Sequence, residues 1–352
     1  MATKQGASAV SAKARGVVIV SAARTAIGRF QGGFSSTPAV QLGAAAIRAA
    51  VQRAGIDPAR IDEVLMGNVI QAGEGQAPAR QAGMKAGLPP SVGATTINKI
   101  CGSGLKAVMF AAQAIRAGDA GVIVAGGMEN MTLGPYLLPQ ARQGYRLGHG
   151  TLLDATVHDG LWCAFQNQHM GNSAEWIARE YRLTREELDE YAYNSHRKAI
   201  AAIQAGKFKA EIVPVEIPQR KGPPVVIDTD ENPRADTSLE ALAKLRPAFQ
   251  EGGMVTAGNS PGITDGAAAL VVMDEDTAAE LGVKPLARIT GYAQTAESRS
   301  NCSPRPSLPC ASCWTKRATP WTTLTCLRST RRSQRRWWPM ARHWAWIGLK
   351  ST

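Results

Sequence analysis

Short β-branched runs alternate with alanine-rich stretches over the first 125 residues, and this alternation restricts the fold more than any other feature of the chain. Strands are expected at 17–20, 64–70, 94–100 and 121–125, and helices at 41–54, 78–86 and 105–116. A helix between two strands carries the chain back across the sheet, so the strands that it joins run parallel. The pattern therefore predicts an α/β fold with a mainly parallel sheet and helices on both faces.

A long polar excursion interrupts the alternation after residue 130. Residues 131–175 are rich in Gly, His, Gln and Asn. Thr184 and Glu187 have the spacing of a capping box, which predicts that a helix begins there and runs to about residue 205. Two more buried strands are expected at 267–273 and 287–293. A chain of 352 residues can bury the core of one large or two medium domains.

The composition changes abruptly near residue 299. Residues 301–352 hold ten of the 40 Lys and Arg residues, six of the eight Trp and four of the six Cys, but no Asp or Glu. The first 300 residues therefore carry a net charge of +2, against +12 for the whole chain. An interpretation as a nucleic-acid or membrane-surface protein would rest on this tail alone, so neither partner is expected.

The near-neutral body points to the cytoplasm. Its two cysteines suit a reducing compartment. Residues 1–15 lack the apolar core of a secretory signal, and we expect them to be a disordered lead-in. The sequence has no apolar run long enough to span a bilayer.

Three interpretations of the tail are open. It could bind nucleic acid through basic residues and stacking tryptophans. It could form a zinc site, although one Cys-x-x-Cys pair with scattered partners is a weak signal and we expect no metal; the candidate ligands are Cys302, Cys310, Cys313, Cys326 and His343. We favour a frameshift near residue 299, because back-translation read one nucleotide earlier gives ordinary amphipathic segments such as Glu-Ile-Asn-Glu-Ala-Phe.

The segment 98–106, Asn-Lys-Ile-Cys-Gly-Ser-Gly-Leu-Lys, joins an expected strand to an expected helix. The sulfur of Cys101 would lie near unpaired helix N–H groups, whose positive partial charge favours the thiolate. Gly102 and Gly104 allow a tight turn. This arrangement resembles the nucleophile elbow of hydrolases. A lone cysteine is more often a small buried hydrophobe, but this context favours Cys101 as a nucleophile.

Six segments, in the expected order, resemble the thiolases of the acetyl-CoA acetyltransferase type. They are residues 18–28, 75–82, 98–105, 125–131, 169–175 and 255–267. The resemblance implies a thiolase-like layered αβαβα fold whose C-terminal half is largely missing here. The implied division is a thiolase N-terminal domain at 16–282 with a loop domain inserted at about 131–252, the start of the C-terminal domain at 283–298, and an aberrant tail at 299–352.

The resemblance also implies the chemistry. Cys101 would take the acyl group from an acyl-CoA thioester and pass it to a second CoA ester or to free CoA. No cofactor is implied beyond these CoA substrates, and the intact family member would be a homo-oligomer, a dimer or a tetramer. The CoA contacts carried over by position are Arg234, Ala248, Phe249 and Ser260, and the residues lining the acyl pocket are His169 and Met170. Residue type alone leaves an alternative for each: an ordinary solvated arginine for Arg234, core packing for Phe249 and Met170, and a structural histidine for His169.

Three catalytic motifs of the family's C-terminal half do not occur in this sequence: Asn-Glu-Ala-Phe, Gly-His-Pro and Cys-x-Gly. Carbon–carbon bond formation needs a base and donors that hold the enolate charge. We therefore expect acylation of Cys101 but impaired turnover. A β-ketoacyl synthase is disfavoured by Gly102 and by the long insertion. A non-catalytic acyl-CoA-binding protein is disfavoured by the retained Cys101 motif.

Overall fold

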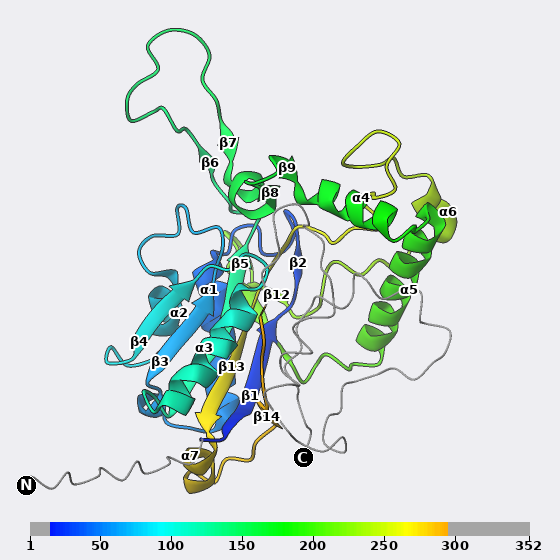
Figure 1. The fold of residues 1–352 in the computed structure, drawn as a ribbon. Helices are drawn as coiled ribbons and strands as arrows, with labels where there is room; N and C mark the ends of the chain where they lie inside the picture. The colour runs from blue at the N-terminus through cyan, green and yellow to red at the C-terminus, as the bar shows by residue number, and fades with distance from the viewer. Residues whose placement is uncertain (1–14, 295–352) are drawn as a thin grey trace, which may run out of the picture.

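The computed structural model describes residues 15–294, so the expectations for the lead-in and for the tail lie outside the described part of the chain. An eight-stranded sheet organises this part (Figure 1). Its strands are β1 (Val17–Thr25), β2 (Gly28–Arg29), β3 (Glu63–Gly67), β4 (Gly93–Ile97), β5 (Val122–Asn130), β10 (Ile212–Val213), β13 (Thr264–Asp274) and β14 (Ala287–Arg288). The main path has the order β10-β1-β13-β5-β3-β4, while β14 pairs with β1 and β2 pairs with β13.

The sheet is mixed, so the prediction of a mainly parallel sheet is wrong: three of its strand pairings are parallel and four are antiparallel. β3 pairs in parallel with β4 and β5, and β1 pairs in parallel with β10. β13 lies antiparallel between β1 and β5. This reversal escaped the prediction because β13 follows a long excursion, whereas the earlier strands follow single crossover helices.

Helices cover both faces of the sheet, as the alternating pattern predicted. α1 (Ala39–Ala54) and α2 (Pro78–Ala86) lie on one face, and α3 (Ser103–Ala117) lies on the other (Figure 1). Phe34, Leu42, Ile47 and Met66 belong to the core under α1 and α2. Leu65, Ile115 and Ile123 belong to the core under α3. Alternate residues of β3 and β5 therefore supply the two cores, because successive side chains of a strand point to opposite faces.

The chain leaves the sheet after β5 and rejoins its main path at β13, apart from the short pairing of β10. The elements on this excursion are β6 (Tyr136–Leu137), β7 (Leu153–Asp154), a π-helical turn η2 (Thr156–Leu161), β8 (Trp162–Cys163), β9 (Gln168–His169), α4 (Met170–Glu180), α5 (Arg185–Gln204), β11 (Val215–Ile217), β12 (Val225–Ile227) and α6 (Leu239–Ala243). The predicted capping box is present at the start of α5, where Thr184 and Glu187 each bond the other's backbone N–H. Two small elements lie outside the excursion, the 3-10 turn η1 (Pro58–Arg60) and α7 (Glu275–Glu280).

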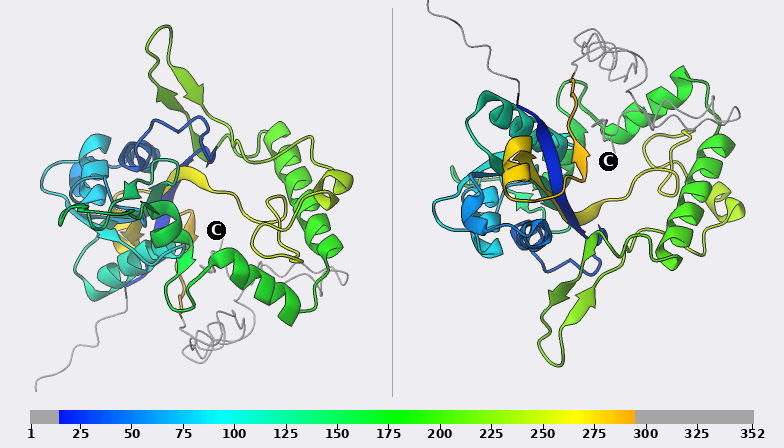
Figure 2. Two further views of the ribbon diagram at one scale, coloured as in Figure 1. Left: turned by 90° about the horizontal axis from the view of Figure 1, so that it is seen from above. Right: turned by 90° about the horizontal axis from the view of Figure 1, so that it is seen from below.

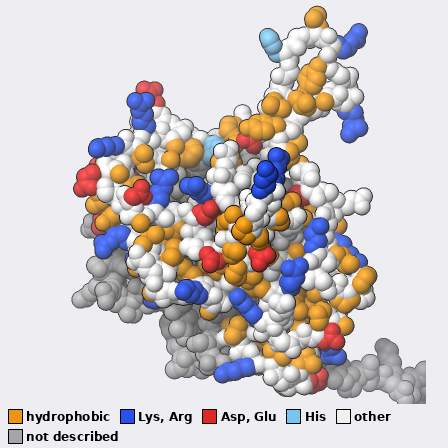
Figure 3. Space-filling model, turned by 180° about the vertical axis from the view of Figure 1, so that it is seen from behind, with side chains coloured by type: hydrophobic (Ala, Val, Ile, Leu, Met, Phe, Trp, Pro, Cys, Tyr) orange, Lys and Arg blue, Asp and Glu red, His pale blue; other side chains and the backbone are white. Residues whose placement is uncertain are grey.

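Two hairpins project from the molecule. The arm, residues 136–154, contains β6 and β7 and extends far from the sheet, with hydrophobic and basic side chains on its surface (Figure 3). Leu147 at its end is fully exposed. The β11–β12 hairpin extends in a different direction (Figure 2). Among residues 15–294, no helix combines the length and the apolar character that crossing a membrane requires.

Arg24 fastens the excursion to the sheet. Arg24 belongs to β1, and its guanidinium binds the Asp230 carboxylate at 2.7 and 3.0 Å and the Glu211 carboxylate at 2.8 Å. The same guanidinium lies over the ring of Phe208. One side chain thereby contacts three residues of the returning chain. A planar guanidinium with several N–H donors suits this role better than a lysine ammonium does.

Candidate active site

Cys101 lies exposed in the turn between β4 and α3, as predicted. The expected strand up to residue 100 is wrong, because β4 ends at Ile97 and three residues of turn precede the cysteine. Ile100 adopts a φ of +50°. A β-branched residue rarely takes this left-handed conformation, which costs roughly 1–3 kcal/mol and needs neighbouring groups to hold it.

Two polar side chains hold the strained turn. The Asn98 Oδ1 accepts a hydrogen bond from the Ile100 N–H at 3.0 Å. The Ser103 Oγ accepts from the Lys99 N–H at 2.8 Å and donates to the Ile100 carbonyl at 2.5 Å. These bonds fix the backbone on both sides of Ile100, so the direction in which Cys101 leaves the turn is set by Asn98 and Ser103.

The N-terminus of α3 lies unusually close to the sheet. A Cβ atom on Gly67 of β3 would lie 2.6 Å from the Ser103 Cβ atom and from the Gly104 nitrogen. A Cβ atom on Gly127 of β5 would in turn lie 3.3 Å from the Gly104 Cα atom. Glycine therefore sets how near α3 comes to β3 and β5. This packing fixes the N-terminus of α3, which has a positive partial charge, next to Cys101, the candidate nucleophile.

His169 and Phe249 form a second group, brought together from positions eighty residues apart. The His169 and Phe249 rings stack with their centroids 4.9 Å apart. The His169 Nδ1 accepts a hydrogen bond from the Gly171 N–H at 3.0 Å and caps α4. Burial lowers the pKa of His169, so the ring is held neutral with Nδ1 as an acceptor and Nε2 as the donor.

Gly171 makes this stacking possible, because a Cβ atom there would lie 2.2 Å from the Phe249 ring. Met170 is the first residue of α4 and is 43% exposed, which does not fit the alternative of a core residue. Both predicted pocket residues therefore lie at the start of α4, and His169 also contacts Phe249, which was predicted as a CoA contact.

The remaining predicted residues lie on the surface of the excursion. Arg234 is exposed, and its backbone N–H donates to the His196 Nδ1 at 3.1 Å. Ala248 is exposed, and its N–H donates to the Val255 carbonyl at 2.9 Å. The Ser260 Oγ donates to the Thr256 carbonyl at 2.7 Å. A small cavity beside Ser260 is also lined by Ala174, Ala178, Leu188, Val255, Asn259 and Pro261.

A pair of glutamates near the turn that carries Cys101 was not predicted. Glu129, in β5, accepts hydrogen bonds from the Val69 and Ile70 N–H groups at 2.8 and 3.1 Å. Burial, and then the nearby Glu129 charge, raise the pKa of Glu74 to about 7. Asn68, 1% exposed, donates from Nδ2 toward both carboxylates. Asn68 directly follows β3, and Glu129 is the second-last residue of β5, which pairs with β3 in parallel. The carboxyl ends of parallel strands share one edge of the sheet, so these positions could have predicted that the two side chains meet.

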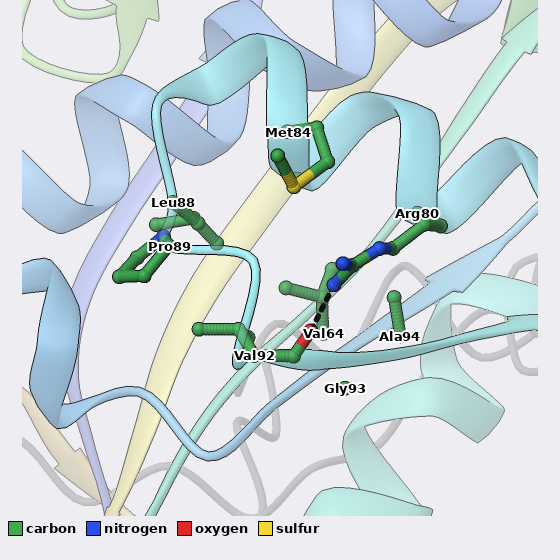
Figure 4. A pocket seen from close by; sticks show the side chains of 9 residues that line it. Val64, Arg80, Met84, Leu88, Pro89, Val92, Gly93 and Ala94 are labelled. Carbon is green, nitrogen blue, oxygen red and sulfur yellow. Dashed lines mark hydrogen bonds between the residues drawn. The ribbon is translucent and has the colours of Figure 1, made fainter.

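A shallow pocket between α2 and β4 contains none of the predicted site residues (Figure 4). Arg80 crosses it and donates to the carbonyls of Val92 and Pro90. This guanidinium ties α2 to the loop before β4, which is a structural role. In the described part of the chain, no group of three or more His, Cys, Asp and Glu side chains is placed to hold a metal ion.

Comparisons with known proteins agree on one family. The model of the thiolase N-terminal domain matches residues 17–276. The acetyl-CoA acetyltransferase of Escherichia coli is 58% identical over 277 residues, which cover 78% of this chain and 70% of that protein. The acetyl-CoA acetyltransferase of Pseudomonas aeruginosa is 57% identical over 277 residues, 79% of this chain and 70% of that protein. The solved structure of an acetyl-CoA acetyltransferase from Syntrophomonas wolfei superposes with a TM-score of 0.79 at 45% identity, covering 81% of this chain and 71% of that one.

Proposed function

Because the chain belongs to the thiolase family and has its layered α/β fold, we propose that it is an acyltransferase of the acetyl-CoA acetyltransferase type with Cys101 as nucleophile. The observation that carries the proposal is the turn before α3. An exposed cysteine there follows a strained residue and stands at the positive end of a helix. A cysteine so placed is suited to nucleophilic attack, and a structural cysteine needs none of these features.

The first step is transfer of an acyl group from CoA to the protein. The Cys101 thiolate attacks the thioester carbonyl carbon, a bond forms between that carbon and Sγ, and the bond from carbon to the CoA sulfur breaks. CoA leaves as a thiolate and takes a proton from water. The acyl-cysteine then passes its acyl group to a second CoA ester or to free CoA.

CoA would bind on the excursion. Arg234 is an exposed residue, and its guanidinium is suited to nucleotide phosphates. Phe249 would be the second nucleotide contact and stacks on His169, which with Met170 would line the acyl pocket. Ala248 and Ser260 would contact the pantetheine arm, and Ser260 lies beside the small cavity described above. Pro261 stands where the family often has Ser, so the contact there differs from the usual one.

Condensation would be impaired in this chain. The Asn-Glu-Ala-Phe, Gly-His-Pro and Cys-x-Gly motifs do not occur in its sequence. Loss of a single oxyanion donor lowers the rate about 10²–10³-fold. The cysteine of the Cys-x-Gly motif, which would act as the base, is also missing from this sequence. The acyl-enzyme would therefore form and then accumulate.

The domain division given above from the resemblance is part of the same proposal, as is location in the cytoplasm. We also assign self-association to the β4 side of the sheet. β4 pairs with β3 on one edge, and the described chain places no strand on its other edge. A free edge offers unpaired backbone groups to a second copy. Sedimentation would test this by showing a dimer that a Thr95→Pro substitution separates.

Release of CoA tests the function. Acetyl-CoA mixed with the protein should release about one equivalent of free CoA per chain and then stop, and Cys101→Ala should release none. Cys163→Ala, at the buried cysteine, serves as the matched control and should behave as the parent. Continued formation of acetoacetyl-CoA would refute the impairment. Acetyl-CoA binding with no release of CoA would instead identify a non-catalytic acyl-CoA-binding protein.

A further inference from the structure

Glu129 occupies a position from which it can act on the nucleophile turn without touching it. Its carboxylate accepts from the Val69 N–H at 2.8 Å, from the Ile70 N–H at 3.1 Å and from the Asn68 Nδ2 at 3.2 Å. All three donors belong to the segment that follows β3. The Val69 and Ile70 N–H groups both bind this one carboxylate, so Glu129 helps to fix the course of the segment.

The segment is connected to the turn by two hydrogen bonds. The Asn68 N–H donates to the Ile97 carbonyl at 3.0 Å. The Asn98 Nδ2 donates to the Val69 carbonyl at 3.4 Å, and the Oδ1 of the same side chain accepts from the Ile100 N–H. A continuous series of contacts thus runs from the Glu129 carboxylate through Val69 and Asn98 to the residue before Cys101.

The two carboxyl groups of this cluster differ in their surroundings. Burial raises the pKa of Glu129, but its hydrogen bonds from Val69 and Ile70 oppose that rise. Glu74 has one long contact, at 3.5 Å from the Asn68 Nδ2, and its Oε2 is buried without a partner. The proton of the pair therefore belongs on Glu74, and Glu129 keeps the charge that its backbone donors stabilise.

We propose that Glu129 is a positioning residue for the Cys101 nucleophile, acting through Val69 and Asn98 on the strained turn at Ile100. The inference rests on the proposed function for its biological meaning, because it concerns the same cysteine. Its structural content is narrower: the Glu129 carboxylate determines where the thiol of Cys101 stands relative to the N-terminus of α3.

The test is a double-mutant cycle on the reactivity of Cys101 toward iodoacetamide. Trypsin cuts after Lys99 and after Lys106, so the peptide 100–106 reports alkylation of this cysteine alone. The variants are Glu129→Gln, Asn98→Ala and the two combined. Glu129→Gln keeps the size of the side chain but places an amide donor against a backbone donor. Glu63→Gln is the control, because Glu63 lies at the other end of β3 and binds Thr95.

Each single variant should slow alkylation about tenfold, the effect of losing one hydrogen bond to a charged or strained group. Cys101 is already exposed, so a looser turn would not make its thiol more accessible to iodoacetamide. It would move the thiol away from the N-terminus of α3, which favours the reactive thiolate. The combined variant should be no slower than either single one, since both interrupt the same series of contacts. Glu63→Gln should react as the parent does.

Two results would overturn the proposal. One is an unchanged alkylation rate in Glu129→Gln. The other is a combined variant in which the two losses multiply, which would show independent effects. If Glu129→Gln does not fold, Glu129→Asp takes its place in the cycle, because it keeps the charge and withdraws it by one methylene group. Acylation by acetyl-CoA, measured on the same samples, reports separately on the proposed function.

Discussion

Single residues define the candidate site, and Ile100 is the clearest of them. The motif around Cys101 was visible in the sequence because glycines next to a cysteine are a local signal. The left-handed backbone of Ile100 was not, because isoleucine disfavours it and distant contacts impose it. The stacking of His169 on Phe249 was equally hidden, since it joins residues eighty positions apart. Residue type alone also left Met170 as core, whereas the structure exposes it.

Glu74 predicts a pH dependence of stability. Folded Glu74 keeps its proton up to about pH 7, whereas the unfolded chain releases it near the ordinary value of 4.5. Its stabilisation is therefore fully present below pH 4.5 and is lost as the pH rises to 7. Glu129 is the charged group that faces it, and Asp265 acts on Glu129 in turn.

Glu74→Gln should remove this dependence. The loss in the parent should be roughly 1–2 kcal/mol, below the full value of the shift because Glu74 is partly exposed. Urea unfolding at several pH values measures it, with Glu216→Gln at an exposed position of β11 as the control. If the stability of the parent chain changed with pH just as that of Glu74→Gln does, the pKa of Glu74 would not be raised by folding.

Arg234 tests the CoA contacts at the same scale. Arg234→Ala should raise the Kd for CoA about tenfold, the loss of one charge-assisted contact to phosphate, with little change in Tm because the side chain is exposed. Calorimetric titration of CoA measures it. Arg60→Ala, in η1, should bind as the parent does, and equal affinity of both variants would remove Arg234 from the CoA site.

At the scale of elements, local signals predicted well and long-range ones did not. The helix at 78–86 and the capping box of α5 follow from residues close in sequence. The direction of β13 depends on how the excursion returns, which no local pattern records. β4 ends at Ile97 because its pairing with β3 stops there, and three residues separate it from Cys101. The residues from Asn98 to Ile100 include no strong strand breaker, so the sequence did not show this end.

The contact between β3 and α3 gives a test of element packing. Gly67→Ala places a methyl group 2.6 Å from Ser103 and Gly104, so it should destabilise the fold by about 1–3 kcal/mol and slow alkylation of Cys101. Gly83→Ala, inside α2, meets its nearest atom at 3.5 Å and should be neutral or stabilising by roughly 0.5–1 kcal/mol. Thermal unfolding compares them, and equal effects would contradict the close approach.

On the scale of the whole molecule, the sheet and the excursion depend on a few connections. Arg24 is one of them, with two carboxylates and an aromatic ring as its partners. The sequence indicated an insertion, because the alternating pattern stops near residue 131, but it gave no sign that Arg24 would bind Asp230. Such pairs depend on the final fold, and their residue types are common on any surface.

Two ion pairs make a matched comparison. Arg24→Ala should lower the free energy of unfolding by about 2–4 kcal/mol, since it leaves the largely buried Asp230 carboxylate without a cation and with the Ile27 N–H as its remaining donor. Arg288→Ala breaks the exposed pair with Glu275 and should cost about 0–1 kcal/mol. Chemical denaturation measures both. Similar losses would mean that Arg24 does not hold the excursion to β1.

The most direct measurement of the central claim is the mass of the peptide 100–106 after the protein meets acetyl-CoA. The account predicts that this peptide gains one acetyl group, removable by free CoA, and that Asn98→Ala slows the gain. An unmodified peptide from folded protein that demonstrably binds acetyl-CoA would contradict it, because Cys101 would then be a cysteine at a helix terminus without acyl chemistry.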